Sequence, residues 1–188
     1  MRILVIQLKR IGDLILTTPA IAALREKFPH AKLSLVVSPA VEGLLPAFSG
    51  PLRERQVELQ LDLPGSLPEV RVDPMQLEQA LVEIVSNALD AMPSGGRLRI
   101  GAVSNGETPG AQVVIEVSDT GPGIPEHVLP SVCEPFFTTR QEGTGLGLAI
   151  AKRYVEQNGG RLEIGSQAGG TTVRVWLPAA TSDGAVAV

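Results

Sequence analysis

The sequence predicts an α/β fold: a two-layer sandwich of a mixed, mostly antiparallel sheet with helices on one face, preceded by a short parallel βαβ fragment. Apolar residues alternate at a spacing of two in several stretches after about residue 53, which is typical of strands with one face on a core. Two helices with distinct start and stop signals separate these stretches. Residues 1–45 differ, because continuous apolar runs at 3–6 and 33–37 flank a helical stretch, as in parallel strands buried on both faces.

The length allows one domain and a fragment, since 188 residues is little more than one average domain. We predict a truncated βαβ segment at residues 1–46, a junction at 47–52, a domain at 53–178 and a flexible tail at 179–188. Strands of the domain are expected where apolar residues alternate, around Leu59, Ile100, Ile115, Ile164 and Val175.

Composition excludes several classes of protein. The net charge of −4 argues against nucleic-acid binding. No apolar run of about 18 residues occurs, so we expect no membrane span. The single Cys133 and two histidines provide neither an intrachain disulfide nor a zinc cluster, which predicts a cytoplasmic protein whose metals are bound through oxygen.

The first helix of the domain is defined by its start. Asp73 is a good N-cap, Pro74 occupies the first helical position, and Gln76 the third. One apolar stripe follows, at Leu77, Leu81, Ile84, Ala88 and Met92. The second helix is expected at about residues 146–157, between a glycine cluster and a glycine-rich exit.

A polar stripe runs beside the apolar one, because Glu83, Asn87 and Asp90 are spaced four and three apart. An amide oxygen held at a pocket can complete the shell of Mg²⁺ together with phosphates and waters. The same spacing also occurs on ordinary solvated helix faces, so the stripe leaves both interpretations open.

Two glycine-rich turns flank the second half of the domain. Asp119 ends a strand and starts Asp119–Ile124, where a carboxylate can accept a hydrogen bond from an exocyclic amine and glycines let a flat ring approach, although an ordinary turn has the same residues. Gly143–Leu148 opens the second helix with bare backbone N–H groups that suit a di- or triphosphate. This turn lacks the spacing of a Walker P-loop or a dinucleotide-binding fingerprint. The segment 125–142 between the turns could fold over a ligand.

The order of these motifs is recognisable: EIVSNALDAM, DTGPGI, EPFFTTR, GTGLGLAI and GGTTVRVWLP. Over about residues 53–178 the chain resembles the ATP-binding catalytic domain of bacterial sensor histidine kinases, of the superfamily (GHKL, or HATPase) shared with DNA gyrase and heat-shock chaperones. The resemblance implies a Bergerat-type fold, the cofactors ATP and Mg²⁺, and transfer of the γ-phosphoryl group to a histidine in two-component signalling.

The resemblance also implies roles for individual residues. Asn87 would bind Mg²⁺, Glu83 would lie beside the γ-phosphate, and Arg140 would belong to the catalytic lid. Further nucleotide contacts would come from Asp90, Asp119, Gly121, Gly123, Ile124, Phe137, Thr138, Gly143, Thr144, Gly145, Leu146, Gly147, Leu148 and Thr172.

The phosphoacceptor of such kinases is a histidine on a helical dimerisation domain, and no such hairpin precedes the domain here. His30 follows a helix and His127 falls in the lid segment, so neither has the setting of an acceptor. We therefore expect the acceptor domain and the downstream response regulator to be separate partners. A non-catalytic, nucleotide-responsive interaction module is the alternative.

Residues 1–45 resemble the N-terminus of heptosyltransferases of glycosyltransferase family 9, which start with a Rossmann-like βαβ unit. Asp13 would correspond to the general base of that family, but it is also a suitable helix cap. The chain would then be a chimera, and a heptosyltransferase fragment is the remote functional alternative. We expect residues 1–46 to pack on the ATP domain or to pair with another copy, because an isolated βαβ fragment has unpaired edges.

Overall fold

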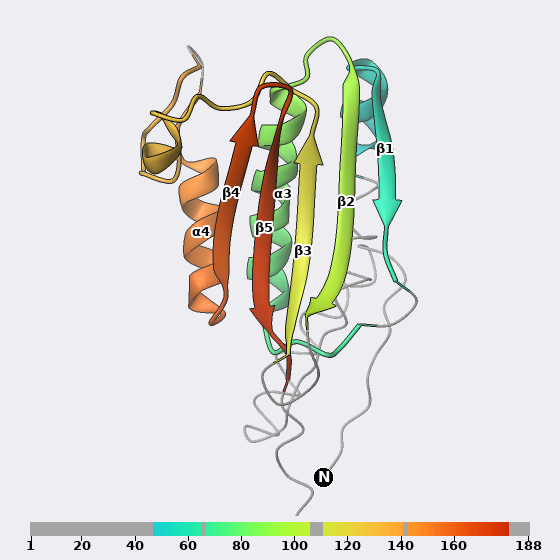
Figure 1. Ribbon diagram of the computed structural model, residues 1–188, viewed down its shortest axis with the longest axis vertical. Coiled ribbons are helices and arrows are strands. Elements are labelled where there is room, and N and C mark those ends of the chain that lie inside the picture. The colour runs from blue at the N-terminus through green and yellow to red at the C-terminus, as the bar shows by residue number, and fades with distance from the viewer. Residues whose placement is uncertain (1–46, 65–66, 106–110, 141–142, 181–188) are drawn as a thin grey trace, which may run out of the picture.

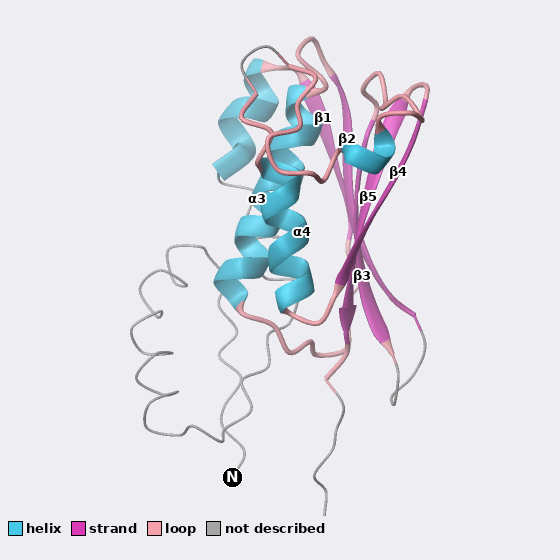
Figure 2. Ribbon diagram, turned by 90° about the vertical axis from the view of Figure 1, so that its left-hand side faces the viewer, coloured by secondary structure: helices cyan, strands magenta, loops and turns pink. Residues whose placement is uncertain are grey.

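A five-stranded sheet forms one layer of the protein, and α-helices cover one of its faces (Figures 1 and 2). The structure is a computed structural model that describes residues 47–64, 67–105, 111–140 and 143–180. Its named elements are β1 (Val57–Asp62), α3 (Pro74–Asp90), β2 (Gly96–Asn105), β3 (Gln112–Asp119), the 3-10 helix η1 (Leu129–Ser131), α4 (Gly147–Gln157), β4 (Arg161–Gln167) and β5 (Gly170–Pro178). The predicted two-layer α/β fold is confirmed, whereas the βαβ fragment predicted at residues 1–46 lies outside the described residues.

The sheet has the strand order β1-β2-β3-β5-β4 and contains one parallel pair. Strand β1 runs parallel to β2, and the other neighbours are antiparallel. The predicted mixed, mostly antiparallel sheet is confirmed, but the alternation along residues 57–61 did not identify β1 as the strand of the parallel pair. Alternation reports that one face is buried and does not report direction, whereas a helical crossover such as α3 joins parallel strands.

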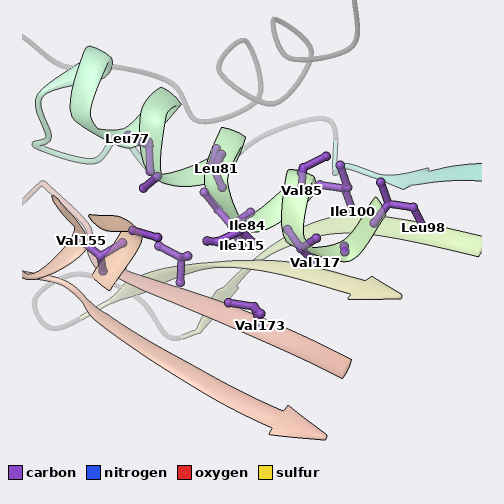
Figure 3. Close-up of a cluster of buried hydrophobic side chains, with 14 of the residues drawn as sticks. Leu77, Leu81, Ile84, Val85, Leu98, Ile100, Ile115, Val117, Val155 and Val173 are labelled. Atoms are coloured by element: carbon purple, nitrogen blue, oxygen red, sulfur yellow. The ribbon is translucent and has the colours of Figure 1, made fainter. Parts of the chain in front are cut away.

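The core lies between the helices and the inner face of the sheet (Figure 3). All five residues of the predicted stripe on α3 are buried, and Leu81, Ile84 and Ile115 are at most 1% exposed. Burying a side chain of this size contributes about 1.5–3 kcal/mol. This packing fixes which edge of α3 faces the core and leaves its polar stripe at the side.

The start of α3 is joined to the end of α4 by Asn158. Asp73 caps α3 by accepting hydrogen bonds from the N–H groups of Met75 and Gln76, at 3.0 and 3.3 Å. The Asp73 N–H donates to Asn158 Oδ1 at 2.6 Å, and Asn158 Nδ2 donates to Gln76 Oε1 at 2.9 Å. Asn158 thus takes the place that a reciprocal side chain within α3 has in a capping box.

Four chain segments meet at one end of the sheet, which is the upper end in Figure 1. The register pairs Val57 with Gly96, so β1 and β2 both begin there. Asp119 pairs with Leu98, which places the end of β3 and the turn after it at the same end. The turn between β4 and β5 is the fourth segment.

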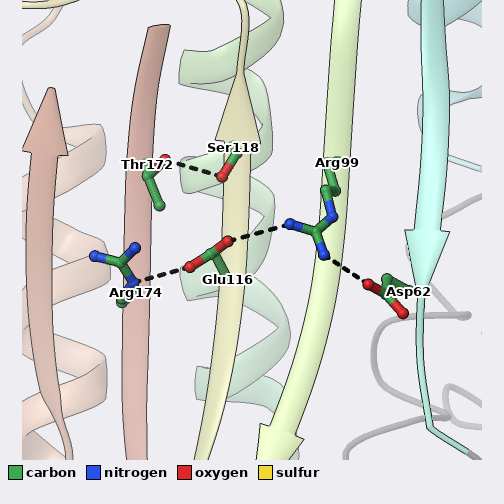
Figure 4. A network of polar contacts seen from close by, with 6 residues as sticks. All are labelled: Asp62, Arg99, Glu116, Ser118, Thr172 and Arg174. Atoms are coloured by element: carbon green, nitrogen blue, oxygen red, sulfur yellow. Dashed lines mark hydrogen bonds and ion pairs between the residues drawn. The ribbon is translucent and has the colours of Figure 1, made fainter. Parts of the chain in front are cut away.

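The opposite face of the sheet carries a row of ion pairs (Figure 4). Arg99 pairs with Asp62 at 2.6 Å and with Glu116 at 3.7 Å, and Arg174 Nε donates to Glu116 at 2.8 Å. Each of these side chains is partly exposed, so an individual pair stabilises the fold by about 0–1 kcal/mol. This face of the sheet is therefore charged and partly exposed within the described residues.

Residues 47–54, whose first part was predicted as a junction, are helical. Phe48 and Leu52 pack against the core, so the packed domain begins before residue 53. At its other end, Ala179 forms an isolated bridge with Val70. Within the described ranges, no helix combines the length and apolar character needed to cross a membrane.

Candidate functional site

A pocket of about 390 Å³ opens between the end of α3, the start of α4 and the segment that joins β3 to α4. Most of the predicted site residues line it: Glu83, Asn87, Asp90, Gly123, Ile124, Phe137, Thr138, Arg140, Gly143, Thr144, Gly145, Gly147 and Leu148. Asp119, Gly121, Leu146 and Thr172 are not among its lining residues.

Helix α3 meets the start of α4 at this pocket. A Cβ added to Gly147 would lie 2.9 Å from Glu83 Oε2 and 3.3 Å from Asn87 Nδ2. Glu83 is oriented by Gln79, whose Nε2 donates to Glu83 Oε1 at 2.9 Å. The glycine therefore lets the first turn of α4 approach the polar stripe of α3.

The start of α4 has no capping side chain. Leu146 occupies the N-cap position, and within the described residues the first turn has no side-chain capping hydrogen bond. The preceding Gly145 has φ +66°, and a Cβ there would lie 2.5 Å from the carbonyl carbon of Phe136. Free N–H groups and the helix dipole make this terminus suitable for an anion.

Asp119 lies at the end of β3 with one carboxylate oxygen in use. Its Oδ1 accepts hydrogen bonds from the N–H groups of Gly121 at 2.9 Å and Thr171 at 3.2 Å. Burial raises the pKa of the carboxyl group, and these two hydrogen bonds lower it in part. Since no described residue donates to Oδ2, that oxygen can accept a hydrogen bond from a ligand.

The turn after Asp119 is tightly packed. A Cβ on Gly121 would lie 2.9 Å from Asp119 Oδ1 and 3.0 Å from the carbonyl oxygen of Ala91. Gly123 has φ +79°, and a Cβ there would collide with the carbonyl oxygen of Gln167. The N–H of Ile124 donates to Ser166 Oγ at 2.7 Å, so β4 supports this turn.

Thr172 was predicted as an adenine-side contact, and that role stays a prediction. Thr172 lies on the uncovered face of the sheet, where its hydroxyl is 2.9 Å from that of Ser118 (Figure 4). Its neighbour Thr171 contacts Asp119. Alternation along β5 could have revealed this, because Thr171 shares the parity of the buried Val173.

The segment that covers the pocket contains Phe136 and Arg140. Phe136 has φ +68° and is 77% exposed, and its N–H donates to Gly145 O at 2.9 Å. Arg140 reaches across to the end of α3, where Nη1 donates to Asp90 Oδ2 at 2.7 Å and Nη2 to Asn87 O at 3.0 Å. His127 is exposed in the same segment.

Sequence reasoning missed Arg55, which pairs with Asp90 Oδ1 at 2.8 Å. Asp90 therefore contacts two arginines from segments far apart in the sequence. No local sequence pattern predicts this contact, because residues 55 and 90 are brought together by the pairing of β1 with β2.

Residues 72–181 match the family of histidine kinase-, DNA gyrase B- and HSP90-like ATPases. This is more than half of the chain, so the protein belongs to that family and contains its ATP-binding domain. The sensor histidine kinase ZraS of Escherichia coli (strain K12) is 40% identical over 125 residues, which are 66% of this chain and 26% of ZraS. The catalytic domain of histidine kinase ThkA superposes with a TM-score of 0.70 at 25% identity, covering 78% of this chain and 94% of that one.

The C4-dicarboxylate transport sensor protein DctS of Rhodobacter capsulatus is 37% identical over 173 residues, which are 91% of this chain and 25% of DctS. That share exceeds what residues 47–188 could provide, so the match extends into residues 1–46. None of these comparisons supports the predicted heptosyltransferase resemblance or a chimera. The chain spans about a quarter of the length of these two relatives.

Proposed function

We propose that this domain binds Mg²⁺-ATP and supplies the γ-phosphoryl group to a histidine on a separate dimerisation domain of a two-component kinase. The observation that carries the proposal is the contact between the polar stripe of α3 and the uncapped start of α4 across Gly147. The carboxylate of Glu83 and the amide of Asn87 lie close to this helix start, and such a grouping supports a role in phosphoryl transfer, which depends on positioning and charge neutralisation.

Asp119 would hold the adenine ring. Its Oδ2 is available, and the glycines at 121 and 123 keep side chains away from the turn that follows. A carboxylate that is already desolvated loses less solvation when an amine donor arrives, so the hydrogen bond is favourable. The ring would therefore lie near the end of β3.

The phosphates would lie at the start of α4, where Gly145 and Gly147 carry backbone N–H groups and line the pocket together with Gly143, whose N–H donates to the carbonyl oxygen of Arg140 at 3.4 Å. The described residues contain no cluster of three His, Cys, Asp or Glu that could hold a metal ion. Asn87 would thus contribute one amide oxygen, and Mg²⁺ would neutralise phosphate charge when bound. Glu83 lies beside this position and would orient the attacking group.

We expect the acceptor histidine to lie on a dimerisation domain that is separate from residues 53–178. The response regulator would be a further partner. His127 is exposed and lies in a turn of the covering segment, not on a helix. We further propose that the packed domain functions as a unit in the cytoplasm. For residues 1–46, a heptosyltransferase fragment with Asp13 as general base stays the remote alternative. Turnover of ADP-heptose would support it.

Calorimetry with Mg²⁺-ATP tests the binding step. We expect Asn87→Ala to lower the Mg²⁺-dependent affinity roughly ten- to hundredfold, because a ligand of the cation is lost. Asn105→Ala is the matched control, since Asn105 lies at the far end of β2. Equal affinity of the Asn87 variant and the control would contradict the proposal.

Transfer is tested by incubation with labelled ATP and a purified dimerisation domain. Label on the acceptor histidine supports a kinase. Nucleotide binding without label would favour the alternative, a nucleotide-responsive interaction module, for which the exposed Phe136 offers an apolar contact.

A further inference from the structure

Arg55 lies outside the pocket but contacts a residue that lines it. Asp90 uses each carboxylate oxygen for a different arginine: Oδ1 for Arg55 at 2.8 Å and Oδ2 for Arg140 at 2.7 Å. Arg140 also donates to the carbonyl oxygen of Asn87 at 3.0 Å. The hold on the Arg140 guanidinium therefore depends on whether one or both carboxylate oxygens of Asp90 are available to it.

The three residues meet at the end of α3 that borders the pocket. The last turn of α3 contains no basic residue of its own, so Arg55 and Arg140 supply the cations that favour a helix C-terminus. Asp90 and Arg140 line the pocket, whereas Arg55 approaches from the start of β1. Arg55 can thus act on the site only through Asp90.

We propose that Arg55 is a positioning residue that keeps Arg140 available to the nucleotide phosphates by occupying one oxygen of Asp90. Without Arg55, both oxygens of Asp90 can turn to the Arg140 guanidinium and form a bidentate pair, which is the stronger geometry. Arg140 would then be held on α3 and would be less free to contact a phosphate. This inference rests on the proposed function for its effect on ATP.

Arg55 also links the site to the chain that leads into the domain. It directly follows the helix at residues 47–54, whose Phe48 and Leu52 pack on the core. A displacement of this helix would move Arg55 and so change the ion pair between Asp90 and Arg140. The segment preceding β1 is therefore coupled to the residues that cover the nucleotide.

Loss of the ion pair between Arg55 and Asp90 should leave the fold intact. The side chains of Arg55 and Asp90 are 35% and 43% exposed, and such exposed pairs contribute little to stability. Arg53 provides a matched control, because it is exposed, carries the same charge two residues away, and pairs with no acidic group in the part of the chain that the structure describes.

A double-mutant cycle measured by ATP calorimetry tests the proposal. We expect Arg55→Gln to weaken ATP binding about two- to fivefold relative to Arg53→Gln, and to have no effect when Asp90→Asn is also present. Arg55→Lys should restore most of the affinity, since a cation again occupies Oδ1. An equal loss in Arg53→Gln, or a loss that persists with Asp90→Asn, would show a general charge effect and overturn the proposal.

Hydrogen exchange without nucleotide separates this proposal from the proposed function. We expect amides at residues 136–140 to exchange about two- to fivefold more slowly in Arg55→Gln than in Arg53→Gln, while amides of β3 are unchanged. Unchanged exchange would refute the role of Arg55 even if ATP binds. Slower exchange in a protein that fails to bind ATP would refute the proposed function alone.

Discussion

Asp119 combines a cost in stability with the proposed role of binding adenine at a single residue. Burial raises the pKa of its carboxyl group, and the hydrogen bonds from Gly121 and Thr171 offset this only in part. An acid whose pKa is raised on folding binds more protons in the folded state than in the unfolded state. Its contribution to the free energy of unfolding therefore decreases as pH rises above the ordinary value of 3.8, until the raised pKa is passed.

Asp119→Asn should separate the two effects. The amide oxygen can still accept both backbone hydrogen bonds, and the buried charge is gone, so we expect a more stable protein at neutral pH. This gain over the wild type should grow as pH rises through the acid range above 3.8. Affinity for ATP should fall roughly ten- to hundredfold, because an amide N–H₂ or a neutral oxygen replaces the carboxylate acceptor.

Chemical denaturation at several pH values and ATP calorimetry measure these changes. A stability difference that is independent of pH would contradict the burial argument. An unchanged ATP affinity would remove Asp119 from the adenine site.

The sequence predicts which residues form the motifs, but it does not predict which side chains contact one another in the folded protein. Asn87 and the glycines at 123, 143, 145 and 147 line one pocket, as their types and spacing suggested, whereas their roles toward a nucleotide stay predictions. Thr172 lies on the uncovered face of the sheet, which the parity of β5 could have indicated, because the buried Val173 is its neighbour. Arg55 could not be found, because its contact with Asp90 needs the three-dimensional path of the chain.

At the scale of elements, Asn158 fixes the helices against each other. It contacts the start of α3 through Asp73 and Gln76 and the last turn of α4 through the carbonyl oxygen of Tyr154, at 2.8 Å. We expect Asn158→Ala to lower the free energy of unfolding by about 1–3 kcal/mol, since partly buried polar groups lose their partners. ATP affinity should change little, because Asn158 lies at the end of the helix pair away from the pocket.

Urea denaturation and calorimetry of this variant provide the check. Asn105→Ala serves again as the control for loss of an exposed amide. A large loss of ATP affinity without a loss of stability would contradict the assignment of Asn158 as a structural contact.

Helix boundaries were predicted well because cap residues are local signals. Asp73 with Pro74 defined the start of α3, and Gly159, with φ +72°, follows α4 as expected. The direction of β1 was not predictable in the same way. Strand direction depends on the route of the whole β1-α3-β2 crossover, and the alternating residues of one strand do not contain that information.

For the whole molecule, we expect residues 47–188 to fold without the residues before them. The described core draws its side chains from Phe48 to Leu177, and the helix at 47–54 is part of it. Deletion of residues 1–46 should change the free energy of unfolding of this domain by no more than about 1 kcal/mol and leave ATP affinity intact.

Denaturation curves and light scattering of the full and shortened chains measure this prediction. A single larger oligomer formed by the full chain only would support the expected self-association through residues 1–46. Loss of cooperative unfolding in the shortened chain would contradict the domain division.

The parallel pairing of β1 with β2 has a practical consequence for reporters attached to this protein. Because β1 starts at the pocket end of the sheet and β5 finishes at the other, a dye attached just before β1 and a dye attached just after β5 lie at opposite ends of the sheet. A fluorophore at Gln56 should therefore respond more strongly to a ligand in the pocket than the same fluorophore at Ala180, which serves as the reference for ratiometric readings.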